Sequence, residues 1–153
     1  MCFSVGGIIR PDNNVTVTVS DNVDAGEFAQ IFDVSLGGAV GFQNPQTVYP
    51  EWWGENDTAL WNACKRTAAG TLIKLKGRLY NTVPILFING RSNDGLDTAK
   101  VIEGVTPAQR YETIGSFTGT RIRLIDGQDD DVIRFTSEST ASNVAFGLSL
   151  IHI

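Results

Sequence analysis

Hydrophobic and polar residues alternate along much of the chain, in short stretches separated by turn residues. Near the amino terminus, Val15, Val17 and Val19 are each followed by a hydroxyl-bearing residue. This period of two is typical of a half-buried β-strand, in which successive side chains point to opposite faces. We expect further strands of this kind at 32–36, 40–42, 71–76, 79–83, 85–89, 100–105, 120–126, 132–137 and 143–150.

The spacing of the last strands indicates an all-β fold without deciding its architecture. The strand centres near residues 122, 133 and 145 are 11 to 12 residues apart, with Asp-rich or Ser/Thr-rich turns between them. A β-sandwich, a barrel and a coiled solenoid all have strands at this spacing. The pattern alone therefore predicts an all-β chain and leaves these three architectures open.

One segment has helical periodicity, and we expect an amphipathic α-helix at about residues 57–68. Its apolar residues recur at intervals of three and four, which places them on one face of a helix. Asn56 or Asp57 can accept a backbone N–H at the start of this helix. Gly70 suits the left-handed backbone conformation that ends many helices.

Composition restricts the class of protein to which the chain can belong. Of its 153 residues, 42% are hydrophobic and 19% are charged, which excludes a disordered chain and a coiled coil. The net charge of −5 argues against a general nucleic-acid binder and against an anionic-membrane binder. The longest apolar stretches are far below the ~18 residues of a membrane-spanning helix, so we expect no membrane insertion.

Residues for metal binding or nucleophilic catalysis are scarce. His152 is the only histidine, which leaves no plausible Ser-His-Asp triad or His-rich metal site. The two cysteines, Cys2 and Cys64, form no Cys-x-x-Cys pair, and Cys64 fits a small buried residue of the predicted helix. The Asp-rich segment 126–131 lacks the spacing of a calcium loop and is typical of a turn. We therefore expect no metal ion and no cofactor.

Three motifs near the predicted helix resemble a known family. Residues 50–54 read Pro-Glu-Trp-Trp-Gly, residues 56–60 read Asn-Asp-Thr-Ala-Leu, and residues 70–80 read Gly-Thr-Leu-Ile-Lys-Leu-Lys-Gly-Arg-Leu-Tyr. In this order they resemble the entry region of the pectate-lyase-like superfamily, which includes bacteriophage tailspikes. The match covers about residues 47–82. It departs from the family in lacking the Ala-x-Gly-Asp-Gly loop before the helix and in having Lys76 where the family has proline.

The resemblance implies a right-handed, single-stranded parallel β-helix in which the helix at 57–68 covers the end of a coil. An amphipathic helix in that place would protect the unpaired backbone of the open end. Because strands are also expected before the helix, the alternative is an internal plug or a junction between two β regions. The chain would then be one partial domain, 1–153, of a longer protein. Within it we expect short β coils at 1–50, a Trp-rich turn and helix at 51–70, and β-helix coils at 71–147.

The resemblance also implies a function for the parent protein. We expect a phage tailspike or tail-fibre-like protein that binds or degrades cell-surface polysaccharide, assembles as a homotrimer, and is located in the virion tail or outside the cell. The alternatives are a secreted microbial polysaccharide lyase or glycoside hydrolase, and a non-catalytic adhesive β-helix. The family's catalytic acids lie several coils beyond the helix, so we expect this chain to be inactive; the catalytic residues, and whether the parent is an enzyme, stay open.

Two groups of side chains are candidates for substrate binding. Trp52 and Trp53 can either stack on sugar rings or pack the helix against the first coil. Basic residues near the helix can either contact an acidic polysaccharide or form a solvated face. These basic residues are Lys65, Arg66, Lys74, Lys76 and Arg78.

The last six residues, 148–153, read Leu-Ser-Leu-Ile-His-Ile. This hexapeptide is the translation of CTGTCTCTTATACACATC, which is similar to the adapter end of transposase-based sequencing libraries. We therefore expect a non-native tail at 148–153, and a natural protein that continues beyond residue 147.

Overall fold

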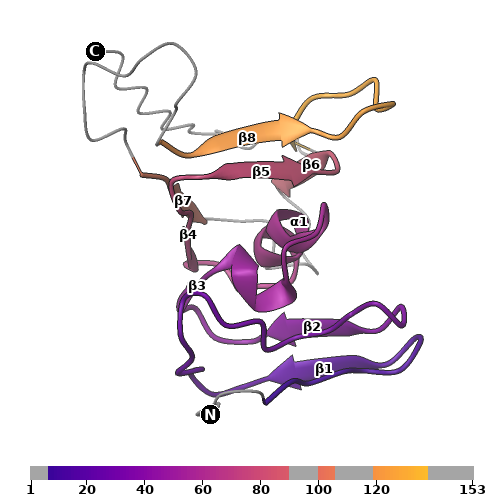
Figure 1. Ribbon diagram of the computed structural model, residues 1–153, viewed down its shortest axis with the longest axis vertical. Helices are drawn as coiled ribbons and strands as arrows, with labels where there is room; N and C mark the ends of the chain where they lie inside the picture. Colours follow the sequence, from indigo (N-terminus) through magenta and orange to yellow (C-terminus); the bar gives the residue numbers. More distant parts are fainter. Residues whose placement is uncertain (1–6, 90–99, 106–118, 138–153) are drawn as a thin grey trace.

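Short strands and two short helices form a stack of layers (Figure 1). The computed structural model describes residues 7–89, 100–105 and 119–137. The strand expected at 143–150 and the tail expected at 148–153 lie outside these residues. In chain order, the elements of the described residues are β1 (Thr16–Val19), β2 (Ala39–Phe42), β3 (Thr47–Val48), the 3₁₀-helix η1 (Pro50–Trp53), α1 (Ala59–Lys65), β4 (Leu72–Lys74), β5 (Leu79–Thr82), β6 (Ile85–Asn89), β7 (Val101–Glu103), β8 (Arg121–Leu124) and β9 (Ile133–Ser137).

The described strands pair in parallel, as the resemblance predicted. They form four sheets, in the orders β1–β2, β3–β4–β7, β5–β8 and β6–β9. The strand expected at 32–36 is reduced to a single bridge between Ile9 and Phe32. The chain turns directly after this bridge, because Gly37 N–H donates to the Val34 carbonyl at 3.0 Å.

The predicted all-β class and the predicted right-handed parallel β-helix are both wrong. The structure is mixed, with 11% helix and 30% strand, and its described strands form small sheets of two or three members rather than a closed or solenoid sheet. Alternation along a strand determines which of its faces is buried, but it contains no information about which strands become neighbours. The described strands are only two to five residues long, and η1 and α1 interrupt their succession.

The predicted helix exists but is shorter than the expected range 57–68. It begins late because the Asn56 side chain accepts both the N–H (3.0 Å) and the hydroxyl (2.8 Å) of Thr58, which makes a turn of this segment. It ends at Lys65, since Arg66 has left helical geometry with φ −108° and ψ 9°. Gly70 has the expected positive φ of 81°, in the turn that leads into β4.

The helix lies between layers instead of covering an end. Figure 1 shows α1 above the β1–β2 sheet and below β5 and β8, and α1 contacts η1, β5 and β6. The expectation that it covers the end of a coil is therefore wrong. Strands precede the helix as well as follow it. The buried side chains of α1 and η1 therefore pack against strands on both sides.

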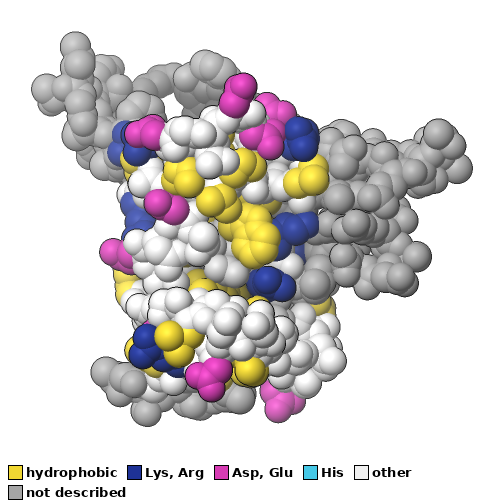
Figure 2. Space-filling model, turned by 90° about the vertical axis from the view of Figure 1, so that its right-hand side faces the viewer, with side chains coloured by type: hydrophobic (Ala, Val, Ile, Leu, Met, Phe, Trp, Pro, Cys, Tyr) yellow, Lys and Arg dark blue, Asp and Glu magenta, His cyan; other side chains and the backbone are white. Residues whose placement is uncertain are grey.

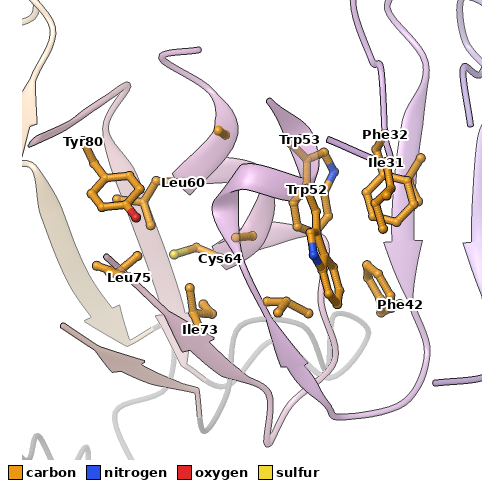
Figure 3. Close-up of a cluster of buried hydrophobic side chains, with 14 of the residues drawn as sticks. Ile31, Phe32, Phe42, Trp52, Trp53, Leu60, Cys64, Ile73, Leu75 and Tyr80 are labelled. Atoms are coloured by element: carbon orange, nitrogen blue, oxygen red, sulfur yellow. The ribbon is translucent and has the colours of Figure 1, made fainter. Parts of the chain in front are cut away.

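The core extends on both sides of this helical layer (Figure 3). On one side, Trp53 packs on Phe32 and Phe42 with ring centroids 5.2 Å and 5.9 Å apart. On the other side, Leu60 and Cys64 of α1 face the strands that follow it. Buried aromatic pairs of this kind add to the free energy of folding beyond their apolar area. The helical layer thus joins the two halves of one hydrophobic core.

Candidate functional site

A groove lies on the outer face of the β1–β2 sheet. In the sheet register Thr18 lies opposite Gly41. Val40 and Phe42 are buried on one face, while Thr16 and Thr18 are exposed. Gly41 belongs to the exposed face because side chains alternate along a strand. Since Gly41 has no side chain, the outer face is hollow at this point.

The chain that follows α1 forms the second wall of this groove. Its position is fixed because Phe42 N–H donates to the Arg66 carbonyl at 2.8 Å. A Cβ atom on Gly41 would lie 3.4 Å from the same oxygen, an ordinary contact. The groove has a volume of about 470 Å³. It is lined by Thr16, Thr18, Gly41, Phe42, Gln43, Pro45, Arg66, Ala68 and Ala69.

Arg66 is the charged residue of the groove lining. Its guanidinium carbon lies 5.4 Å from the ring centroid of Trp61, within the range of a cation–π contact. Its Nε atom is buried and has no hydrogen-bond partner among the described residues. The groove therefore offers hydroxyl, amide and guanidinium groups beside an apolar surface, an arrangement suited to binding a polar ligand that also has apolar faces.

A second cluster of ionisable groups connects η1 to β5. The Glu51 side chain is only 4% exposed, and Arg78 Nε lies 3.2 Å from its Oε1 atom. Tyr80 donates its hydroxyl to the same oxygen at 2.7 Å and accepts the Lys76 N–H at 2.8 Å. Burial raises the pKa of Tyr80 to about 12. Arg78 also contacts Glu55 at 2.5 Å, and we call these five residues the ionic cluster.

The ionic cluster also fastens the loop between β1 and β2. Lys76 Nζ donates to the Glu27 carbonyl and lies over the Phe28 ring, although that ring is 78% exposed. Trp52 Nε1 donates to the Gly26 carbonyl at 3.2 Å. Burial lowers the pKa of Lys76, which is nevertheless surrounded by carboxylates. The geometry is that of a structural network, because each charged group contacts an opposite charge or a backbone carbonyl.

The two tryptophans proposed for sugar stacking are core residues. Trp52 is 1% exposed and Trp53 is 0% exposed. A sugar ring cannot reach either indole unless the core opens. Of the two interpretations left open by the sequence, the structure therefore favours packing. The half-buried Trp61, in α1, is the tryptophan near the groove.

Four of the five basic residues that the sequence groups together are divided among three different places. Arg66 lies at the groove, Lys76 and Arg78 belong to the ionic cluster, and Lys65 Nζ donates to the Leu86 carbonyl at 2.8 Å. Figure 2 shows that on one face of the molecule Lys and Arg side chains are dispersed among hydrophobic and acidic ones. A single basic surface for an acidic polymer is not formed on this face.

The Asp-rich segment and Cys64, the remaining candidates, form neither a metal site nor an activated nucleophile among the described residues. Asp130 in the Asp-rich segment pairs with Arg134 at 3.1 Å. Within residues 7–89, 100–105 and 119–137, no three Asp, Glu, His or Cys side chains come together as a metal site. Burial raises the pKa of the Cys64 thiol to about 12, so it is a packing residue and a poor nucleophile. His152 and Cys2 lie outside the described residues.

Sequence reasoning missed most of the groove. Gly41 was the readable signal, because a glycine inside a strand often marks a place where a ligand or another backbone approaches closely. Thr16 and Thr18 have the ordinary appearance of exposed strand residues. That Arg66 and Trp61 stand beside this face depends on how α1 packs, which no local pattern reveals.

Comparison with known proteins adds no relative to this picture: no family model, no curated protein and no solved structure matches the chain. No helix in the described part of the chain is both long enough and apolar enough to span a bilayer.

Proposed function

We propose that the chain is a polysaccharide-binding segment of a surface protein of the phage tailspike or tail-fibre type, and that it binds glycan in the groove beside Arg66. The observation that carries this proposal is the groove, with its exposed threonines and the Arg66 guanidinium beside an apolar surface. The motifs at 50–54, 56–60 and 70–80 support the same class of parent protein. The β-helix fold is not part of the proposal.

The lining of the groove matches the chemistry of a sugar ring. A pyranose presents hydroxyl groups at its edge and C–H groups on its faces. Thr16, Thr18 and Gln43 can exchange hydrogen bonds with the hydroxyls, while Pro45 and Ala69 offer apolar contact to the ring. A volume of about 470 Å³ is also within the usual range of ligand sites, roughly 300–1,000 Å³.

The proposal is binding and not cleavage. Hydrolysis of a glycosidic bond ordinarily requires two carboxyl groups about 5 to 9.5 Å apart across the sugar. The residues that line the groove include neither Asp nor Glu. Any depolymerising activity, the trimeric assembly, and the location in a virion tail or outside the cell are proposals about the parent, which we base on the resemblance alone.

A glycan array of bacterial capsules and O-antigens, probed with the fluorescently labelled 153-residue chain, tests the proposal. We expect retention on a subset of these glycans. The bound polysaccharide should keep its length on incubation with the chain, as measured by size-exclusion chromatography. Absence of retention on every glycan would overturn the proposal, and shortening of the polysaccharide would replace binding by cleavage.

A further inference from the structure

We infer that Trp61 is a positioning residue for the groove, because its indole ring holds the Arg66 guanidinium at the groove wall before a glycan arrives. This inference rests on the proposed function, since the ligand that Arg66 meets is the polysaccharide of that proposal. It goes further in assigning a role to a residue that does not itself line the groove.

The backbone of Arg66 is held on both sides. Its N–H donates to the Asn62 carbonyl at 2.8 Å, at the end of α1. Its carbonyl accepts the Phe42 N–H at 2.8 Å, from β2. The side chain is therefore the part of Arg66 that can still move, and its guanidinium carbon lies 5.4 Å from the Trp61 ring centroid.

Three other arginines in the described residues pair with carboxylates, whereas Arg123 donates to the Asn81 side-chain oxygen at 3.2 Å. Arg10, Arg78 and Arg134 each lie within 3.2 Å of a carboxylate oxygen. Arg66 is instead placed on an aromatic ring, and its Nε donor has no partner in the described part of the chain. An aromatic face fixes the plane of a guanidinium without occupying its N–H groups. Because the Arg66 Nε atom is buried, the terminal N–H groups are the donors that would meet ligand oxygens.

Fixing the guanidinium in advance should increase the affinity for glycan. A free arginine side chain loses rotamer freedom when a ligand immobilises it, and this loss weakens binding. If Trp61 already restricts the Arg66 side chain in the free protein, most of this conformational entropy is lost before the glycan binds and no longer weakens binding. From the usual cost of immobilising one side chain, removal of the Trp61 ring should weaken glycan binding by roughly threefold to tenfold.

A purely structural role for Trp61 predicts something else. Trp61 is half-buried at the edge of the core, so its replacement by a small residue also lowers the stability of the fold. Loss of affinity alone would therefore not separate the two roles. The test needs a signal from Arg66 itself, together with a variant that keeps an aromatic ring.

The experiment compares the wild-type chain with Trp61→Leu and Trp61→Phe, at a temperature where urea unfolding shows all three to be folded. Two-dimensional NMR of the Arg66 side chain in the absence of glycan should show ring-current-shifted, restricted signals in the wild type and in Trp61→Phe. In Trp61→Leu these signals should move to ordinary positions and become motionally averaged. Titration with the glycan retained on the array should give the affinity loss in Trp61→Leu and near-wild-type affinity in Trp61→Phe.

Each outcome decides a separate question. Identical Arg66 signals in all three proteins would overturn the positioning role, and so would equal glycan affinities in the wild type and Trp61→Leu. Either result would leave the proposed function standing, because the wild-type chain would still bind. If the wild-type chain binds no glycan, the proposed function itself fails and the positioning role fails with it.

Discussion

Arg78 contacts two carboxylates that differ strongly in burial, so the energetics of the ionic cluster can be measured within one site. The Glu51 side chain is 4% exposed and the Glu55 side chain is 77% exposed. Removing Arg78 leaves the Glu51 charge buried, with Tyr80 as its remaining donor. Stranding a buried charge usually costs about 3–5 kcal/mol. We expect about 3 kcal/mol for Arg78→Met, the lower end, because the Tyr80 hydrogen bond survives.

Glu55 provides the matched control for this prediction. It contacts the same guanidinium from solvent, and an exposed pair contributes about 0–1 kcal/mol, so Glu55→Gln should have little effect. The double variant Glu51→Gln/Arg78→Met should lose less stability than Arg78→Met alone, because no charge is then stranded. Urea unfolding followed by fluorescence of the buried Trp52 and Trp53 measures all four free energies. The reasoning is refuted if Arg78→Met costs below about 1 kcal/mol, or if Glu51→Gln fails to restore stability in its presence.

Three further predictions concern single groups. Burial raises the pKa of Tyr80 from 10.0 to about 12, so the contribution of the neutral hydroxyl to stability is complete below pH 10 and is lost as the pH rises toward 12. The difference in unfolding free energy between the wild type and Tyr80→Phe should therefore shrink between pH 10 and pH 12. A constant difference over that interval would contradict this prediction. Cys64, whose thiol pKa burial raises to about 12, should resist iodoacetamide at pH 8 until urea unfolds the chain; native-state alkylation mapped by mass spectrometry would be the contrary result. Lys76→Met should speed chymotryptic cleavage after Phe28, because it removes the ammonium group that lies on that exposed ring. An unchanged cleavage rate would show that other contacts hold the loop between β1 and β2.

Local features of the fold were predictable where one physical cause dominates. The Val/Thr alternation predicted β1 correctly, because a strand with one wet face requires a period of two. The spacing of apolar residues predicted α1, although the Asn56 turn shortens it. Gly70 was expected to have a positive φ, and it does.

The arrangement of these elements was not predictable in the same way. Ile85 of β6 lies opposite Ile133 of β9, a pairing between segments that are distant in sequence and that resemble many other hydrophobic stretches. The motif resemblance led to the expectation of parallel pairing, which is confirmed, and to that of a continuous β-helix, which is wrong. Whether the chain belongs to the pectate-lyase-like superfamily stays a prediction.

The candidate site depended even more on tertiary structure. Glu51 stands inside an apolar motif, and only its packing against Arg78 and Tyr80 explains why a carboxylate is tolerated there. Arg66 had the appearance of one more surface cation in a basic cluster. Its place opposite Gly41 follows from the backbone contact between β2 and the end of α1.

Filling the groove is the most direct test of the claim that glycan binds there. In Gly41→Leu the new Cβ meets only an ordinary contact at 3.4 Å from the Arg66 carbonyl, while the rest of the side chain occupies the groove. Gly26→Leu is the control, because its nearest neighbour would be the Ala29 Cβ at 4.0 Å, away from the groove lining. Calorimetric titration with the array-selected glycan should show at least a tenfold loss of affinity in Gly41→Leu, about 1.4 kcal/mol, and none in Gly26→Leu. Equal affinities for a folded Gly41→Leu and the wild type would contradict the account.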